Sequence, residues 1–208
     1  YAGPGDEVLH SEHGFLMYAI DAHGAGATPI AAPERRLTAD VDALLARVSE
    51  RTRILFLANP NNPTGTYLAT ETLARLRAQL SPSVLLVVDA AYAEFVTRND
   101  YSAGADLVEA GDNVVMARTF SKIFGLGGVR LGWAYCPAAV ADVLNRARNP
   151  FNVSAPAQAA GLAALADVDF TDAARASNDT WLPWTTDALR ELGYEVAPSI
   201  VYFILVRF

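Results

Sequence analysis

Lys122 is the residue whose chemistry is hardest to replace in this chain. It is the only lysine in the sequence, and the other fifteen residues counted as lysine or arginine are all arginines. Arginine keeps its proton in proteins, whereas lysine can lose it and form a Schiff base with a carbonyl compound. On this residue alone two interpretations stay open: an amine that captures an aldehyde, or a surface lysine retained by chance.

The residues around Lys122 suit a phosphorylated ligand. Thr119 and Ser121 offer hydroxyl groups, and the glycines in segment 125–128 allow a backbone to approach a ligand closely. Arg130 can contact a phosphate through two N–H groups. This segment lacks the third glycine of a dinucleotide-binding fingerprint, so the pattern does not indicate a dinucleotide.

Two further polar clusters follow apolar runs. Asn61 and Asn62 lie between prolines after the run that ends at Ala58, which favours a binding loop over an ordinary turn. Asp89 ends a wholly apolar run, where a carboxylate needs a cation, several donors, or a helix N-terminus to cap. Tyr92 lies three residues later and can present its hydroxyl to the same side.

Together these groups describe one ligand, pyridoxal 5′-phosphate (PLP). Its aldehyde suits Lys122, and its phosphate suits the hydroxyls and the guanidinium nearby. Its protonated ring nitrogen needs a carboxylate such as Asp89 to act as an electron sink. Its phenolic oxygen needs donors, which Asn62 and Tyr92 supply. We therefore predict a PLP site.

The elements expected to position these residues alternate between strands and helices. This alternation predicts an α/β fold with a mostly parallel central sheet and helices on both faces. Ligands bind beyond the carboxyl ends of such strands, where the polar clusters fall. A strand is expected to begin at Val8, and further strands at 27–31, 53–58, 84–89, 113–117, 132–136 and 201–206. Helices are expected at 40–48, 71–80, 138–148, 155–166 and 172–192, the last interrupted at Pro183.

Composition argues against several classes of function. The net charge of -7 disfavours nonspecific nucleic-acid binding, and no apolar run has the length of a membrane span. His10, His13 and His23 match no metal-ligand spacing, so we expect no metal site. The single cysteine, Cys136, fits a reducing compartment, and we expect a cytoplasmic protein.

Four ordered motifs resemble those of the class I and II aminotransferases, a fold-type I, PLP-dependent family. They are Asn-Pro-Thr-Gly at 62–65, Asp-x-x-Tyr at 89–92, Ser-Lys at 121–122 and Arg130. The resemblance covers essentially the whole chain. Within the family, segments 5–18, 59–65, 120–130 and 150–156 are most similar to the histidinol-phosphate aminotransferases.

The resemblance implies an aspartate-aminotransferase-like fold and a role for each site residue. Residues 1–149 would form a PLP-binding large domain without its N-terminal part. Residues 150–208 would hold linking helices and the start of a small C-terminal α+β domain. Lys122, Asp89 and Tyr92 would be catalytic, with Lys122 moving the proton at the substrate Cα. The cofactor would be bound by Lys122, Asn62, Asp89, Tyr92, Thr119, Ser121, Arg130 and Phe15.

Phe15 matches the aromatic position that stacks on the cofactor ring, with Tyr18 as its neighbour, although a core aromatic is an alternative interpretation of Phe15. The chain departs from the family by lacking its N-terminal glycine turn and its C-terminal arginine. It also carries Tyr202 where asparagine is usual before Phe203. We therefore expect a piece that is incomplete at both ends.

The implied reaction is transamination of L-histidinol phosphate with 2-oxoglutarate. It gives imidazole acetol phosphate and glutamate in histidine biosynthesis, and the family implies a homodimer. The alternatives within enzymes are an aromatic amino-acid aminotransferase or a phosphothreonine decarboxylase. A noncatalytic PLP-binding sensor is the alternative from another class, and an α/β domain with accidental motifs is the least specific interpretation.

Overall fold

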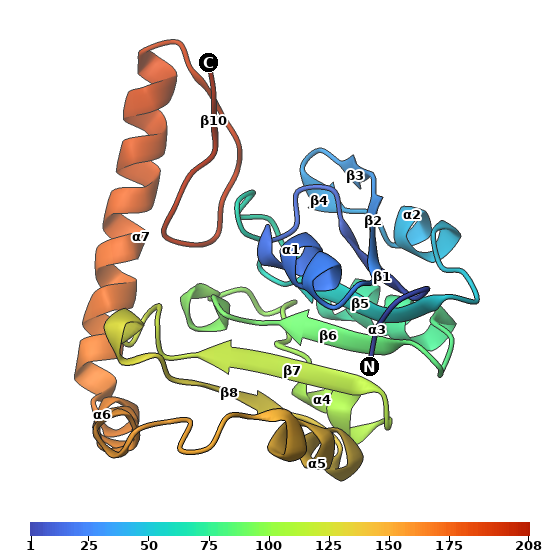
Figure 1. The fold of residues 1–208 in the computed structure, drawn as a ribbon. Helices are drawn as coiled ribbons and strands as arrows, with labels where there is room; N and C mark the ends of the chain where they lie inside the picture. Colours follow the sequence, from blue (N-terminus) through green and yellow to red (C-terminus); the bar gives the residue numbers. More distant parts are fainter.

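A six-stranded sheet forms the centre of the chain, which the computed structural model describes over residues 1–208 (Figure 1). Five neighbouring strands run parallel in the order β2-β1-β5-β6-β7, and β8 pairs antiparallel with β7 at one edge. The predicted α/β fold with a mostly parallel sheet is thus confirmed. The strands are β1 (Glu7–Ser11), β2 (Thr28–Ala32), β5 (Thr52–Ala58), β6 (Leu85–Asp89), β7 (Val114–Thr119) and β8 (Gly132–Tyr135).

Helices cover both faces, because successive side chains of a strand point to opposite sides of the sheet. Leu86 belongs to the largest apolar cluster, which also contains residues of α2, α3 and α4. On the opposite face Val8 packs with Ala22 of α1, and Val115 packs with Val140 of α5. The helices are α1 (Met17–Gly24), α2 (Val41–Ala46), α3 (Thr70–Gln79), α4 (Ala105–Glu109), α5 (Ala138–Ala147), α6 (Ala155–Ala166) and α7 (Val168–Glu191).

Local capping explains why two of the predicted helices begin where they do. The Asp40 carboxylate accepts the backbone N–H groups of Asp42 at 2.9 Å and Ala43 at 3.3 Å, so α2 begins at Val41. The Ser154 hydroxyl accepts the Ala157 N–H at 3.3 Å, and α6 spans the residues predicted for it. The strands predicted at 27–31, 53–58, 84–89, 113–117 and 132–136 correspond to β2, β5, β6, β7 and β8.

The predicted interruption at Pro183 is wrong, because α7 continues through this proline. A proline removes one backbone N–H and leaves the carbonyl four residues earlier without its helical partner. That carbonyl belongs to Asp179, which is exposed, so water can satisfy it. The result is a single long helix that extends away from the sheet (Figure 1). None of the helices combines the length and apolarity needed to cross a membrane.

The predicted strand at 201–206 is also wrong. The strand there is limited to β10 (Val206–Arg207), which pairs antiparallel with β9 (Glu195–Val196). The preceding residues bind elsewhere: the Ile200 N–H donates to the Gly65 carbonyl at 3.0 Å. Val201 is completely buried in a cluster with Tyr92. Contacts with the loop after β5 thus replace the strand pairing.

The sequence did not indicate the shortest elements. Helix α1 has 8 residues and α4 has 5, which is too short for a clear apolar periodicity. A small antiparallel hairpin, formed by β3 (Glu34–Arg35) and β4 (Thr38–Ala39), lies between β2 and α2. Two 3₁₀ turns, η1 (Ala93–Phe95) and η2 (Gly127–Val129), follow β6 and β7.

Candidate active site

The three polar clusters meet at the end of the sheet where the parallel strands have their carboxyl termini. Strands β5, β6 and β7 are parallel neighbours, and their register places Ala58 opposite Asp89 and Asp89 opposite Ala117. The carboxyl ends of these strands therefore lie side by side. Each is followed by a loop that carries one cluster. This is the end at which parallel α/β sheets bind ligands.

A cavity at this end of the sheet brings five of the predicted site residues together. Phe15, Asn62, Asp89, Tyr92 and Lys122 all line it. The wall is completed by Ala58 at the end of β5, Pro60 in the following loop and Ala91 in the loop after β6. An amine, a carboxylate, an amide, a phenol and an aromatic ring thus share one small space.

Asn62 and Tyr92 are joined by a hydrogen bond within the cavity. The Asn62 amide donates to the Tyr92 hydroxyl oxygen at 3.0 Å. Burial raises the pKa of Tyr92, and this outweighs the opposing effect of the Asn62 amide. Tyr92 consequently keeps its proton and can donate it to a ligand oxygen. The Lys122 Nζ lies 5.0 Å from the centroid of the Tyr92 ring, so the amine faces the same space.

Asp89 is held by two donors of the protein. Its Oδ2 accepts the Tyr18 hydroxyl at 2.8 Å, and its Oδ1 accepts the Ala91 N–H at 3.2 Å. Burial, and then the nearby Asp89 carboxylate, raise the pKa of Tyr18, so Tyr18 stays protonated and remains a donor. The helix-cap interpretation of Asp89 fails, because the next helical turn begins at Ala93 with Tyr92 at its N-cap position.

Tyr18, predicted only as a neighbour of Phe15, supports the site through its hydrogen bond to Asp89. The two rings do meet edge to face, with centroids 5.9 Å apart. The polar role of Tyr18 depends on Asp89, which is distant in sequence, so no local pattern could reveal it. The aromatic side of Tyr18 stacks on Phe56 of β5 at 4.7 Å.

Thr119, Ser121 and Arg130 lie together but do not line this cavity. The Ser121 N–H donates to Thr119 Oγ1 at 3.0 Å, and Arg130 Nη1 donates to Ser121 Oγ at 3.4 Å and to the Gly127 carbonyl at 2.7 Å. Arg130 has a φ of 59, a conformation that costs free energy in a non-glycine residue. The three residues form a polar group at the end of β7 and on the following loop, which carries Lys122.

Tyr202, the residue that departs from the family pattern, lies next to the cavity beside Tyr92. Its ring lies 5.8 Å from the Tyr92 ring and 5.1 Å from the Phe95 ring. Burial raises the pKa of Tyr202, while the positive charge of Lys122 opposes this shift. Residues 200 and 201 contact the loop after β5 and Tyr92 instead of pairing as a strand, and this places Tyr202 beside Tyr92.

Comparison with known proteins places the chain in a family. The profile described as "Aminotransferase class I and II" matches residues 1–207. The chain belongs to this family. A histidinol-phosphate aminotransferase of Paramagnetospirillum magneticum is 67% identical over 208 residues, which is 100% of this chain and 57% of that protein. The chain therefore spans little more than half the length of this curated relative.

Solved structures confirm that the fold is aspartate-aminotransferase-like. A histidinol-phosphate aminotransferase of Sinorhizobium meliloti, in complex with pyridoxal-5′-phosphate, superposes with a TM-score of 0.93 at 29% identity. The match covers 99% of this chain and 56% of that chain. The aspartate aminotransferase of Thermus thermophilus with maleate shares the fold, with a TM-score of 0.84 at 24% identity over 98% of this chain and 56% of its own.

Proposed function

We propose that this class I and II aminotransferase uses PLP to transfer the amino group of L-histidinol phosphate to 2-oxoglutarate. The products would be imidazole acetol phosphate and glutamate. The observation that carries the proposal is that Lys122 and Asp89 line one cavity with two further donors, Asn62 and Tyr92. The 67% identity to a histidinol-phosphate aminotransferase supports this choice of substrate.

The chemistry of the donor set fits PLP. Lys122 supplies an amine for the aldehyde, and Asp89 supplies a carboxylate for the protonated ring nitrogen. Asn62 and Tyr92 supply hydrogen-bond donors for the phenolic oxygen, and Phe15 supplies an aromatic face in the same wall. The polar group on the Lys122 loop would hold the phosphate through Thr119, Ser121 and Arg130.

When bound, PLP supplies an electron sink for the charge that develops at the substrate Cα. The protein supplies the proton chemistry around it. The Lys122 amine, once released by the incoming donor, takes the proton from the substrate Cα as a general base. Asp89 holds the proton on the ring nitrogen, since Tyr18 and Ala91 keep the carboxylate oriented through two hydrogen bonds.

Assembly, domain division and location complete the proposal. We infer a homodimer by analogy with the family. We also infer a large domain at residues 1–149 and a second unit at 150–208, which begins just before α6 and α7. A cytoplasmic location is supported by the single cysteine, Cys136, which suits a reducing compartment.

The visible absorbance spectrum tests this function. Wild-type protein mixed with PLP should develop the band of lysine-linked cofactor, and sodium borohydride should fix one cofactor on Lys122. L-histidinol phosphate should remove the band at much lower concentration than L-phenylalanine does. Preferential reaction with phenylalanine would instead support an aromatic amino-acid aminotransferase.

Substitution of Lys122 provides the matched control. Lys122→Ala should abolish both turnover and borohydride fixation, because no amine remains to bind the aldehyde. Lys122→Arg keeps the positive charge without a deprotonated amine, so it should fail in the same way. Undiminished turnover in either variant would refute the assignment of Lys122.

A further inference from the structure

The turn between β1 and α1 carries Phe15 into the wall of the cavity. It closes tightly: the Gly14 N–H donates to the Ser11 carbonyl at 2.9 Å. A Cβ atom on Gly14 would lie only 3.0 Å from that carbonyl oxygen. The turn is followed at once by Tyr18, which binds Asp89. Its position therefore affects two parts of the site.

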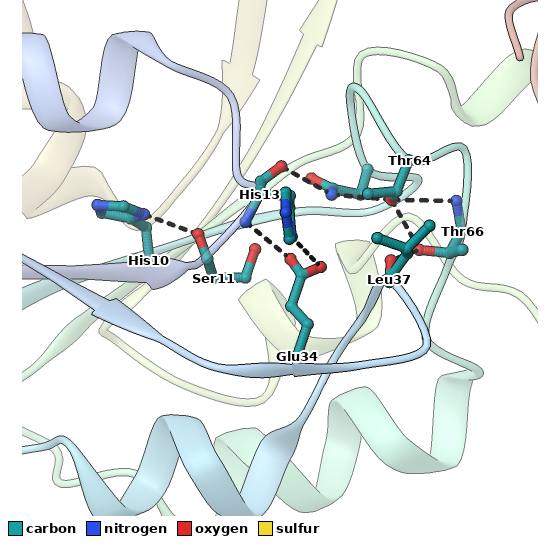
Figure 2. A network of polar contacts seen from close by, with 8 residues as sticks. His10, Ser11, His13, Glu34, Leu37, Thr64 and Thr66 are labelled. Atoms are coloured by element: carbon teal, nitrogen blue, oxygen red, sulfur yellow. Dashed lines mark hydrogen bonds and ion pairs between the residues drawn. The ribbon is translucent and has the colours of Figure 1, made fainter. Parts of the chain in front are cut away.

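His13, in the middle of this turn, is held by both oxygens of one carboxylate. The His13 backbone N–H donates to Glu34 Oε1 at 3.1 Å, and His13 Nδ1 lies 3.0 Å from Glu34 Oε2 (Figure 2). The Glu34 side chain is 2% exposed, compared with 44% for His13. A carboxylate so deeply buried needs hydrogen-bond partners, so Glu34 favours the conformation in which residue 13 supplies two of them.

The carbonyl of His13 provides a third attachment. The Asn61 amide donates to it at 3.0 Å and also to Thr64 Oγ1 at 2.9 Å. Thr64 is bonded to Thr66 at 2.9 Å, and Thr66 donates to the Leu37 carbonyl at 2.7 Å. Figure 2 shows how these contacts join the turn, the β3–β4 hairpin and the loop after β5.

We propose that His13 and Glu34 are positioning residues for the cofactor, holding Phe15 and Asn62 in a fixed relation across the cavity. This inference rests on the proposed function. His13 is part of the turn that carries Phe15, and Glu34 holds it there. The His13 carbonyl also accepts the amide of Asn61, which precedes Asn62 in the loop after β5. Neither His13 nor Glu34 lines the cavity, so both act through these neighbours. A site that is already ordered binds its ligand more tightly, because its loops and side chains lose less conformational entropy on binding.

Three substitutions separate the contacts, a fourth is the control, and a fifth stands in reserve. Glu34→Ala removes both bonds to residue 13, and His13→Ala removes the side-chain bond alone. His13→Asn is the conservative variant, since its amide nitrogen can occupy the place of Nδ1. His23→Ala is the matched control, because His23 is an exposed histidine on α1. Glu34→Gln retains an acceptor for the His13 N–H and replaces Glu34→Ala if that variant does not fold.

Two measurements test the proposal, and one needs no cofactor. In PLP-free protein, amide hydrogen exchange in peptides covering residues 12–18 should be faster in His13→Ala than in wild type. The dissociation constant of PLP should rise by about tenfold in His13→Ala, the effect of losing one hydrogen bond to a charged group. The rise should be larger in Glu34→Ala, and His13→Asn should return most of the affinity.

The outcomes distinguish this inference from the function on which it rests. Exchange and PLP affinity in His13→Ala equal to those of His23→Ala would overturn the inference while leaving the function intact. Failure of His13→Asn to restore affinity lost in His13→Ala would also overturn it. Wild-type protein that captures no PLP would overturn the function and the inference together.

Discussion

At the scale of single residues, Asp89 is held in one orientation by the protein itself, which suits the cationic ring nitrogen proposed for it. Its two oxygens each accept one protein donor, Tyr18 on one side and the Ala91 backbone on the other. A carboxylate has about four sites for accepting hydrogen bonds, so two donors leave room for a ligand. The orientation of the carboxylate is thus set before a ligand binds.

Asp89→Asn should weaken PLP binding by about ten- to a hundredfold, the usual effect of losing a hydrogen bond between charged partners. An amide has nearly the same shape as the carboxylate but cannot neutralise a protonated ring nitrogen. A PLP titration followed by absorbance measures the change. Fixation by borohydride should persist at saturating PLP, because Lys122 is intact. Unchanged affinity would argue against contact between Asp89 and the ring.

Tyr18→Phe should reduce the loss of stability at alkaline pH. The raised pKa of Tyr18 lies above its ordinary value of 10.0, so the folded state keeps a proton that the unfolded state loses. Its stabilising contribution is therefore complete below pH 10 and decreases as pH rises above that value. Urea unfolding at about pH 8, 10 and 11 should show a steeper decline for wild type than for Tyr18→Phe. Parallel declines would contradict the direction of the shift.

Sequence could identify residues whose chemistry is unusual, and it could not identify pairs that are distant in the chain. Lys122, Asp89, Asn62 and Tyr92 were predictable because an amine, a carboxylate and donors each follow apolar runs. The partner of Asp89 is 71 positions away and that of His13 is 21 positions away. Which residues face each other across such distances depends on strand order, which no local pattern encodes.

At the scale of elements, the loop after β5 and the C-terminal segment support each other. Gly65 has a φ of +72, and a Cβ atom there would lie 2.2 Å from the hydroxyl oxygen of Ser199. Its carbonyl accepts the Ile200 N–H at 3.0 Å. This contact brings Tyr202 to the site and explains why the predicted strand at 201–206 did not form.

Gly65→Ala should be more destabilising than Gly193→Ala. Both glycines have positive φ, and the strain of an alanine in that region costs about 1–2 kcal/mol. At Gly193 no atom lies within 4 Å of the added methyl, whereas at Gly65 the methyl also displaces Ser199. Urea unfolding of both variants measures the difference. Equal losses would mean that the contact with Ser199 contributes little.

The prediction of elements succeeded where burial and capping act locally. Asp40 and Ser154 begin α2 and α6, and the apolar runs of β5 and β6 are buried in the core. It failed at Pro183, where exposure lets the helix continue past a missing hydrogen bond. Solvent access and tertiary contacts decide such cases, and neither is visible in a short window of sequence.

At the scale of the whole molecule, PLP should stabilise the folded chain, because only the folded state assembles residues from four separate segments into one cavity. At a free PLP concentration of a hundred times the dissociation constant, the free energy of unfolding should rise by about 2.7 kcal/mol. Urea unfolding with and without PLP measures the rise. Pyridoxine 5′-phosphate, which lacks the aldehyde, should give a smaller rise in wild type. An equal rise with both compounds would argue against the covalent link.

The antiparallel pairing of β8 with β7 has a consequence for the order in which the site forms. Thr119 pairs with Gly132, so Lys122 and Arg130 lie in one short connection between neighbouring strands. Asn62 and Asp89 come together only when β5 pairs with β6, where Ala58 lies opposite Asp89. The connection between these two strands is much longer, because it includes α3. Closing a longer loop costs more chain entropy, and non-local pairing slows folding. During refolding, we expect the segment with Lys122 and Arg130 to become ordered first and the wall formed by Asn62 and Asp89 to follow.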